Sequence, residues 1–308
     1  MDYLDKLIRL SKVEGEINTL CRFQGNWQVK HAQEVEAMGI FHIISQGSCE
    51  VILDNQEHYH LKTGDVFFLP YGLAHHIGSC GLQHCEACLG GMSACEYGAF
   101  SLKTNQIQQY DFEMFCGYVR YSTYSRSFLN LPDFLHLSAQ THPQLNALLQ
   151  LLQHEASLKL PSKSIIDSLC NAMFTYLVRD YAEKSDIRSG ILGALLDKRL
   201  AIAVESMLRQ PEYEWNMERL AELCAMSRAS FIRLFKQKTD MLPGKFLMDL
   251  RMQKAEMLLR ESHKSILAIA LGVGYKSEAH FSQAFKARYG MPPSQFREKI
   301  KPGYTGFD

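Results

Sequence analysis

The sequence lacks any long hydrophobic run. Its 308 residues are 46% hydrophobic, but the apolar stretches are short and broken by charges, whereas a helix that crosses a bilayer needs about 20 consecutive apolar residues. The first residues, MDYLDKLIRLSKVEGE, also lack the basic segment and apolar core of a secretory signal. We therefore expect a cytoplasmic protein that has no membrane partner.

The chain as a whole has no net charge, because 33 Lys and Arg offset 33 Asp and Glu. Residues 198–301, however, hold 19 basic and 11 acidic residues, a net charge of +8, and the remainder holds 14 and 22, a net charge of −8. A basic C-terminal third predicts a polyanionic partner for this part of the chain. Chance segregation of solvated surface charge is the alternative.

The pattern of apolar residues divides the chain into regions. Between about Gln28 and Met92, short β-type runs such as GIFHIIS and DVFFLP are separated by turn residues, which predicts an antiparallel barrel or jelly roll. Residues 140–183 follow a helical period, and the polar segment 184–196 is expected to be a linker. A strand-free, helix-rich segment then extends to about residue 300. The predicted fold class is therefore multi-domain α+β.

The second predicted helix of the middle region carries an apolar stripe, which is formed by Ile165, Leu169, Ala172, Met173, Tyr176 and Leu177. Such a stripe is usually core, and it is also suited to the seam of a homodimer.

An internal repeat with an offset of 50 residues lies in the C-terminal region. SRASFIRLFK, from Ser227 to Lys236, recurs as SEAHFSQAFK, from Ser277 to Lys286. Met241, Pro243 and Phe246 recur at the same offset. A match of this length indicates two copies of one structural unit.

Each copy has the pattern of a helix-turn-helix. A short first helix has Leu220, Ala221 and Cys224 facing inward, or Ile269, Ala270 and Val273 in the second copy. Ser227 or Ser277 then caps the next helix, with Gly272 and Gly274 expected to permit the second turn. The long helix Leu247 to Arg260 joins the copies, so that two helices can enter major grooves one turn of DNA apart, roughly 34 Å.

The segment LAIALGVGYKSEAHFSQAFKARYGMPPSQFR, from Leu267 to Arg297, resembles the signature of AraC/XylS-type transcription regulators, and the resemblance covers about 100 residues. It implies base-reading positions at Ala229, Ile232, Arg233, Ala279, His280 and Gln283. The full set of expected DNA contacts is Arg228, Ala229, Ser230, Ile232, Arg233, Lys236, Glu278, Ala279, His280, Gln283 and Lys286. Double-stranded promoter or operator DNA is the expected partner, with a homodimer, activation and contact with RNA polymerase as further expectations from the family.

The N-terminal segment GDVFFLPYGLAHH, from Gly64 to His76, fits the second signature of the cupin barrel, Gly-(x)5-Pro-x-Gly-(x)2-His. The first signature is incomplete, since His42 stands alone without a His-x-His pair. We therefore expect no catalytic residue, no metal and no cofactor, with His75 and His76 as polar residues at the barrel rim. His58 and His60 have strand-like spacing in a polar, turn-like segment.

The nine cysteines include a C-x-x-C pair, Cys85 and Cys88, next to His84. Three interpretations remain: a zinc site that also uses Cys21 and Cys80, inert buried thiols, and a redox sensor. The remaining cysteines look structural, and these are Cys49, Cys95, Cys116, Cys170 and Cys224.

The arrangement of Cys21, the cupin motif and Cys88 resembles the reactive-chlorine-responsive branch of AraC-type activators. The resemblance implies redox sensing by Cys21, Cys85 and Cys88. A barrel that senses a small organic ligand is the alternative, and a metal-dependent cupin enzyme is disfavoured.

Together these features predict four parts: a cupin-like sensor domain at 1–135, a helical dimerisation segment at 136–183, the linker at 184–196, and a double helix-turn-helix DNA-binding domain at 197–302.

Overall fold

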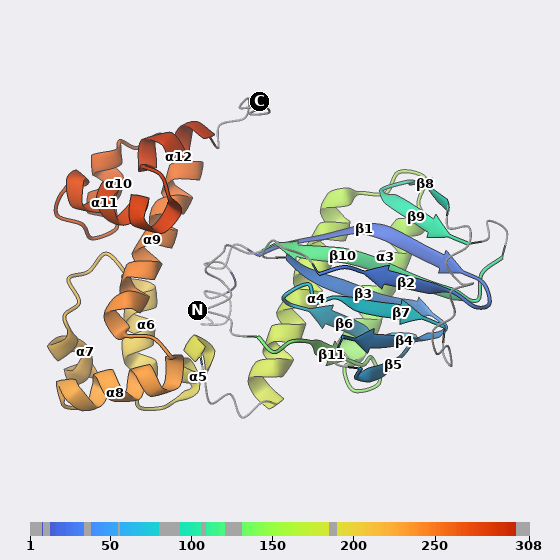
Figure 1. Cartoon of the computed structure of the whole chain (residues 1–308), viewed down its shortest axis with the longest axis horizontal. Coiled ribbons are helices and arrows are strands. Elements are labelled where there is room, and N and C mark those ends of the chain that lie inside the picture. The colour runs from blue at the N-terminus through green and yellow to red at the C-terminus, as the bar shows by residue number, and fades with distance from the viewer. Residues whose placement is uncertain are drawn as a thin grey trace. The chain divides into compact units, whose positions relative to one another are not determined.

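The computed structural model describes Ile8 and residues 13–33, 38–54, 56–79, 93–105, 109–120, 131–184 and 190–299, without the side chains of Met38 and Glu261. The described residues between 13 and 184 belong to one compact unit, and residues 190–299 belong to a second. In the described residues, the first unit is a two-sheet barrel with two helices, and the second is built of helices (Figure 1).

The barrel consists of a seven-stranded sheet with the order β11-β6-β3-β10-β1-β9-β8 and a four-stranded sheet with the order β2-β7-β4-β5. Its strands are β1 (Glu14–Phe23), β2 (Gln28–His31), β3 (Met38–Gln46), β4 (Ser48–Leu53), β5 (His58–Lys62), β6 (Val66–Leu69), β7 (His75–Gly78), β8 (Ser93–Tyr97), β9 (Phe100–Thr104), β10 (Phe112–Arg120) and β11 (Leu135–Leu137).

The centre of the seven-stranded sheet is buried on both faces. Along β6, Phe67 belongs to the barrel core, whereas the next residue, Phe68, makes an edge-to-face contact with Phe174 of a covering helix, with a centroid distance of 5.6 Å. Alternate residues of a strand point to opposite faces. The continuous apolar run VFFL therefore follows from burial on both sides.

Aromatic rings close one part of the core. Trp27 stacks on Phe23 and contacts Phe112, with centroid distances of 4.5 Å in both pairs. All three rings are at most 2% exposed. Because Phe23 and Phe112 lie on paired strands and Trp27 precedes β2, this contact joins the two sheets across the core.

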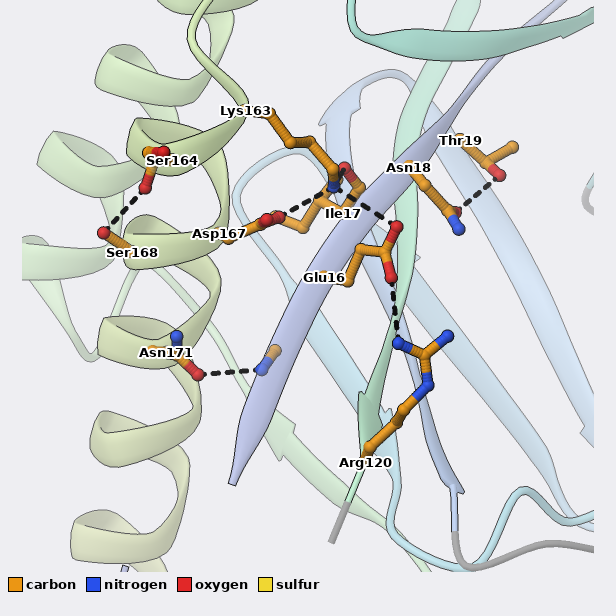
Figure 2. A network of polar contacts seen from close by, with 11 residues as sticks. Glu16, Ile17, Asn18, Thr19, Arg120, Lys163, Ser164, Asp167, Ser168 and Asn171 are labelled. Atoms are coloured by element: carbon orange, nitrogen blue, oxygen red, sulfur yellow. Dashed lines mark hydrogen bonds and ion pairs between the residues drawn. The ribbon is translucent and has the colours of Figure 1, made fainter. Parts of the chain in front are cut away.

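Two helices of the first unit follow the barrel, α3 (Pro143–Ser157) and α4 (Lys163–Lys184). Helix α4 is tied to β1 by polar contacts: Asn171 Oδ1 accepts a hydrogen bond from the backbone N–H of Gly15 at 2.8 Å, and Lys163 donates to the carbonyl of Ile17 at 3.0 Å (Figure 2). Lys163 also lies 2.7 Å from Asp167 on its own helix. These contacts hold the start of α4 against β1.

The predicted stripe on α4 was partly wrong. Leu169, Met173 and Leu177 are buried, but Ile165 is 48% exposed. The buried set of this helix is Ile166, Leu169, Cys170, Met173, Phe174, Leu177 and Val178. The buried face is thus rotated from the predicted one, because α4 covers a broad sheet and buries adjacent positions such as Leu169 and Cys170.

The second unit contains α5 (Gly190–Leu196), α6 (Ala201–Arg209), α7 (Met217–Leu223), α8 (Arg228–Thr239), α9 (Pro243–Glu261), α10 (Ile266–Gly272), α11 (Glu278–Tyr289) and α12 (Pro293–Lys299). Part of the linker predicted at 184–196 is helical, since Lys184 ends α4 and Gly190–Leu196 form α5. Ile191 and Ala194 are fully buried, so the apolar sequence GILGALL has a packing role.

Strand β1 lies before the region that was predicted to contain strands. Its sequence, EGEINTLCRF, has polar residues at Glu16 and Asn18, and the pairing with β10 shifts in register between Ile17 and Thr19. This bulge interrupts the alternation of apolar and polar residues, which explains why the strand was not predicted. Within the described part of the chain, no helix combines the length and apolar character needed to cross a membrane.

Gly117 of β10 faces this bulge. A Cβ atom at Gly117 would lie 2.1 Å from the carbonyl oxygen of Glu16 and 2.8 Å from the Cα of Ile17. Both contacts are with backbone, which cannot move aside without disturbing the pairing of β1 and β10. Only glycine fits at this position.

We therefore predict that Gly117→Ala lowers the free energy of unfolding of the barrel by about 2 kcal/mol, because the added methyl group forces the strands apart. Chemical denaturation of the full chain, followed by tryptophan fluorescence, measures this change. Gly272→Ala is the control, because a Cβ there meets no heavy atom within 4 Å. Equal stability of Gly117→Ala and the unaltered chain would contradict the role assigned to the bulge.

Candidate nucleic-acid interface

Helix α8 is fixed by a capped N-terminus and a buried aromatic face. The Ser227 hydroxyl accepts a hydrogen bond from the backbone N–H of Ser230 at 3.2 Å, as predicted for a serine cap. Phe231 and Phe235 are fully buried one turn apart, and Thr239 continues the same face. The opposite face must therefore point away from the core.

The residues predicted to contact DNA from α8 lie on this outer face. Arg228, Ala229, Arg233 and Lys236 are exposed, whereas Ser230 and Ile232 are half-buried. The Ser230 hydroxyl accepts a hydrogen bond from Ser227 at 3.0 Å, so it takes part in the cap.

Helix α11 repeats this construction. Ser277 accepts a hydrogen bond from the backbone N–H of His280 at 3.3 Å, and Phe281 and Phe285 are fully buried. All residues predicted to contact DNA from this helix are exposed, namely Glu278, Ala279, His280, Gln283 and Lys286.

The turns before α8 and α11 share one hydrogen bond. Met226 N–H donates to the carbonyl of Ala221, and Tyr275 N–H donates to the carbonyl of Ala270, both at 2.9 Å. These partners are offset by 49 residues, while the serine caps are offset by 50, so the second turn holds one additional residue, Lys276.

A left-handed residue closes each turn. It is Ala225, with φ of 52°, in the first copy and Gly274, with φ of 86°, in the second. The prediction that Gly272 also shapes the turn was wrong, since Gly272 lies at the end of α10 and its φ is not positive. The left-handed conformation suits glycine and strains alanine.

Helix α9 is shared by the two helix-turn-helix units. Phe246 near its start contacts Phe235 of α8, with a centroid distance of 5.8 Å. Met252, Ala255 and Leu259 further along α9 belong to the cluster that buries Phe281 and Phe285. Its 19 residues correspond to about 28 Å. Figure 1 shows α8 and α11 near opposite ends of this helix, whose length is comparable with the roughly 34 Å of one turn of DNA.

Basic side chains on this surface differ in their partners. Arg228 forms an ion pair with Glu218 at 3.1 Å, and Lys276 pairs with Glu214 at 2.7 Å. Arg233 is exposed and has no ion-pair partner among the residues described. Its guanidinium is therefore available for two parallel hydrogen bonds, which is the geometry that guanine offers in the major groove.

The sulfur atoms inside the barrel form a second group of candidate residues. Cys21 of β1, Cys49 of β4 and Cys116 of β10 are buried in the core between the sheets. A hydrogen bond to Cys21, together with burial, raises the pKa of the Cys116 thiol well above its usual value. Cys21 and Cys116 also line one small pocket with His31 and Lys103.

The other predicted redox residues, Cys85 and Cys88, lie outside the described residues, as do Cys80 and His84. Among the cysteines predicted to be structural, Cys49, Cys116 and Cys170 are buried, but Cys95 of β8 is exposed. Cys95 occupies a strand whose first four residues are all exposed, so its apolar neighbours Ala94 and Tyr97 gave a misleading pattern.

Three histidines meet inside the barrel. His31 of β2, His42 of β3 and His75 of β7 bring one ring nitrogen each to within 4.8 Å of one another. His42 and His75 are fully buried, so the prediction that His75 lies at the rim was wrong. Its neighbour His76 is half-buried and lies 3.3 Å from Gln28. His58 and His60 belong to strand β5 and point outward.

Desolvation keeps the three imidazoles neutral. Burial and the positive charge that neighbouring imidazoles would carry lower the pKa of His42 well below its usual value, and burial with the His75 ring beside it lowers the pKa of His31 to about 3. Burial lowers the pKa of His75 as well. Neutral imidazoles are the form in which histidine accepts a hydrogen bond or binds a metal.

No local sequence signal marks His31 or Cys116 as a site residue. His31 becomes a neighbour of His75 through the pairing of β2 with β7, and Cys116 lies opposite His42 in the pairing of β10 with β3. Both relationships depend on the register between strands that are distant in sequence.

Two protein families match the chain. Residues 2–183 match the cupin family, and residues 220–299 match a helix-turn-helix domain family.

Curated relatives match over nearly the full length of the chain. An uncharacterized HTH-type transcriptional regulator of Haemophilus influenzae is 42% identical over 97% of this chain and 99% of its own length. The HTH-type transcriptional regulator MtrA of Neisseria gonorrhoeae is 32% identical over 97% of this chain and 99% of its own. The RCS-specific HTH-type transcriptional activator RclR of Escherichia coli is 29% identical over 98% and 99%, respectively.

All three relatives are named as transcription regulators, and the repeated helix-turn-helix and the two-sheet barrel correspond to the two matched families. The chain therefore belongs to the AraC family of transcription regulators and carries a cupin domain before its DNA-binding domain.

Proposed function

We propose that this protein is a sequence-specific transcription activator that responds to reactive chlorine or a related oxidant through cysteine thiols. The DNA-binding part of the proposal is supported by the shared structure of α8 and α11. In each helix, a serine cap and two buried phenylalanines leave predicted base-reading residues on the outer face, all of which are exposed except the half-buried Ile232. A capped helix of this kind places its N-terminal side chains at base edges in the major groove.

Arg233 is the proposed principal base contact. We expect Arg233→Ala to weaken binding to the cognate operator by about 1–3 kcal/mol and to relax specificity at one base pair, because a bidentate contact with guanine is lost. Lys236→Ala is expected to weaken binding to all sequences equally and to reduce the salt dependence, as loss of one phosphate contact does. Fluorescence anisotropy with operator and scrambled duplexes at several salt concentrations separates these effects.

Gln237→Ala is the matched control, since Gln237 is exposed on the same helix but outside the proposed contact set. If Arg233→Ala weakened binding to operator and scrambled DNA by the same factor, the base-reading role would be refuted.

The oxidant response is supported by a relative whose name describes an RCS-specific activator, and by the position of Cys21 in the pocket lining. In the proposed chemistry, hypochlorous acid oxidises the thiol of Cys88, or of its neighbour Cys85, to a sulfenic acid while its chlorine is reduced to chloride. The thiol of Cys21 then attacks the sulfenic sulfur, a disulfide forms, and water leaves. Such a bond would tie β1 to the segment that contains the C-x-x-C pair.

Loss of either thiol of this pair should abolish the response. We expect Cys21→Ala and Cys88→Ala each to remove activation by hypochlorous acid in a reporter strain, while binding of the purified proteins to operator DNA stays at the level of the unaltered chain. Cys85→Ala tests the alternative position for the sulfenic acid. Mass mapping of alkylated peptides identifies the disulfide directly.

Cys95→Ala is the control, because Cys95 is an exposed thiol on β8 that has no proposed role. An undiminished response in both the Cys21 and the Cys88 variants would refute the thiol mechanism. The alternative, a small organic molecule bound in the barrel, would then become the working hypothesis.

A homodimer formed through α3 and α4 is part of the proposal. Apolar side chains remain exposed on these helices, including Leu151 at 54% and Ile165 at 48%. In the proposed dimer, these side chains are the ones that the second chain covers.

We expect the double variant Leu151→Glu/Ile165→Glu to sediment as a monomer at concentrations where the unaltered chain is a dimer, because each change introduces a charge into the interface. Analytical ultracentrifugation measures this. If the double variant sediments like the unaltered chain, the interface does not involve these two residues. Leu267→Glu in α10 is the control, because it adds a charge at an exposed leucine outside the proposed interface.

A further inference from the structure

The three histidines inside the barrel come from three strands, and one of them belongs to neither cupin signature. His31 and His75 are direct neighbours across the pairing of β2 with β7, while His42 projects from the opposite sheet. We propose that His31, His42 and His75 bind a divalent transition-metal ion of the zinc type. None of the three proposed ligands is a cysteine of the proposed oxidant response.

The hydrogen bonds of His75 fix the ring in a metal-binding form. Its Nδ1 lies 2.7 Å from the carbonyl oxygen of Leu73. Because a carbonyl only accepts, Nδ1 carries the proton and Nε2 presents its lone pair to the barrel interior. A histidine that binds a metal through one ring nitrogen commonly donates from the other to a backbone carbonyl in this way.

Both ring nitrogens of His42 also lie close to a potential hydrogen-bond partner. Its Nε2 lies 2.8 Å from Nε2 of His75, and its Nδ1 lies 3.2 Å from Sγ of Cys116. Two imidazole lone pairs cannot face each other unless a proton or a cation lies between them. With a metal ion in that position, His42 donates from Nδ1 to Sγ of Cys116, which gives the second ligand its own supporting partner.

The spacing requires a small adjustment. Two nitrogens on a tetrahedral zinc ion, each about 2.0–2.1 Å from the metal, are roughly 3.3 Å apart, so Nε2 of His42 and Nε2 of His75 must separate by about half an ångström. The His31 ring stacks on His75 at a centroid distance of 4.6 Å. It is half-buried and lines the pocket, so it can turn its nitrogen toward the ion.

The chemistry of the donors selects the class of metal. Three neutral imidazoles, with no carboxylate in the cluster, suit zinc, copper, nickel or iron rather than magnesium or calcium, which prefer oxygen ligands. The small pocket lined by His31, Lys103 and Cys21 adjoins the cluster through His31. The fourth position on the ion stays available to water or to another small ligand.

The test uses the full chain, stripped with a chelator and then titrated with zinc chloride in an isothermal titration calorimeter. We expect the unaltered protein to bind zinc and to melt at a higher temperature when zinc is present. His31→Ala should weaken zinc binding at least tenfold and abolish the shift in melting temperature. His31 is the informative position, because its half-buried side chain can be removed without opening the fully buried core.

Two controls make the result specific to this site. His76→Ala removes the adjacent histidine of β7, which is outside the cluster, and should bind zinc like the unaltered chain. Cys85→Ser/Cys88→Ser should also retain zinc, which distinguishes the histidine cluster from the C-x-x-C pair. Circular dichroism establishes that each variant is folded.

The proposal is overturned if the unaltered chain does not bind zinc, or if folded His31→Ala binds it as tightly as the unaltered chain. It is also overturned if the cysteine double variant, and not His31→Ala, loses the metal. Each of these readouts is independent of DNA binding and of the oxidant response.

Discussion

Phe231 and Phe235 lie one helical turn apart and are fully buried, and Phe281 and Phe285 repeat this relationship. Burying both rings of a pair leaves a helix only one orientation about its axis. Ser227 and Ser277 then fix where each helix begins. The position of every proposed base contact follows from these two restraints, because a residue at a known distance from the cap and from the buried rings can face only one direction. The DNA-binding surface is therefore a consequence of how the core is packed.

In the barrel, strand pairing likewise fixes the direction of each side chain, because alternate residues of a strand point to opposite faces. Strands β3 and β10 are covered on both faces, so the buried polar groups on either face have little access to bulk water and must satisfy one another. His42 does so through His75 on one side and Cys116 on the other. On the opposite face of the sheet, Ser45 does so by donating to the Glu113 carboxylate at 2.7 Å. The polar residues that these two strands bury are thus paired across strands.

The DNA-binding domain could be predicted from the sequence because its restraints are local. Caps, buried phenylalanines and turn residues all lie within about 15 residues of one another, and the repeat displays them twice. Gly272 was assigned to the turn wrongly, because sequence alone does not separate the last residue of a helix from the left-handed residue that follows it. The role of Ala225 in the first turn was not predicted, because alanine rarely adopts the left-handed conformation.

The barrel could be predicted only in outline, because its interior depends on pairing between distant strands. The second cupin signature predicted His75 but not that His31 and His42 lie beside it. The predicted rim position was wrong because the surrounding strands bury His75 completely. His31 has no signature motif and enters the cluster only because β2 pairs with β7 in one register. A shift of one residue would turn His31 to the opposite face and dissolve the cluster, so no composition or spacing rule could have found it.

Cys116 connects the two proposed properties of the barrel. Its thiol contacts Cys21, which has a role in the proposed oxidant response, and His42, which has a role in the proposed metal site. Drawing Cys21 into a disulfide removes the thiol that Cys116 now contacts, and a metal on His42 requires Cys116 to accept a hydrogen bond from Nδ1. Each event alters the hydrogen bonding of the same sulfur atom. Cys21 and Cys116 line the same pocket, and Cys21 belongs to β1, the strand that Asn171 and Lys163 of α4 contact. A change at the Cys116 sulfur would therefore act next to the strand to which α4 is tied.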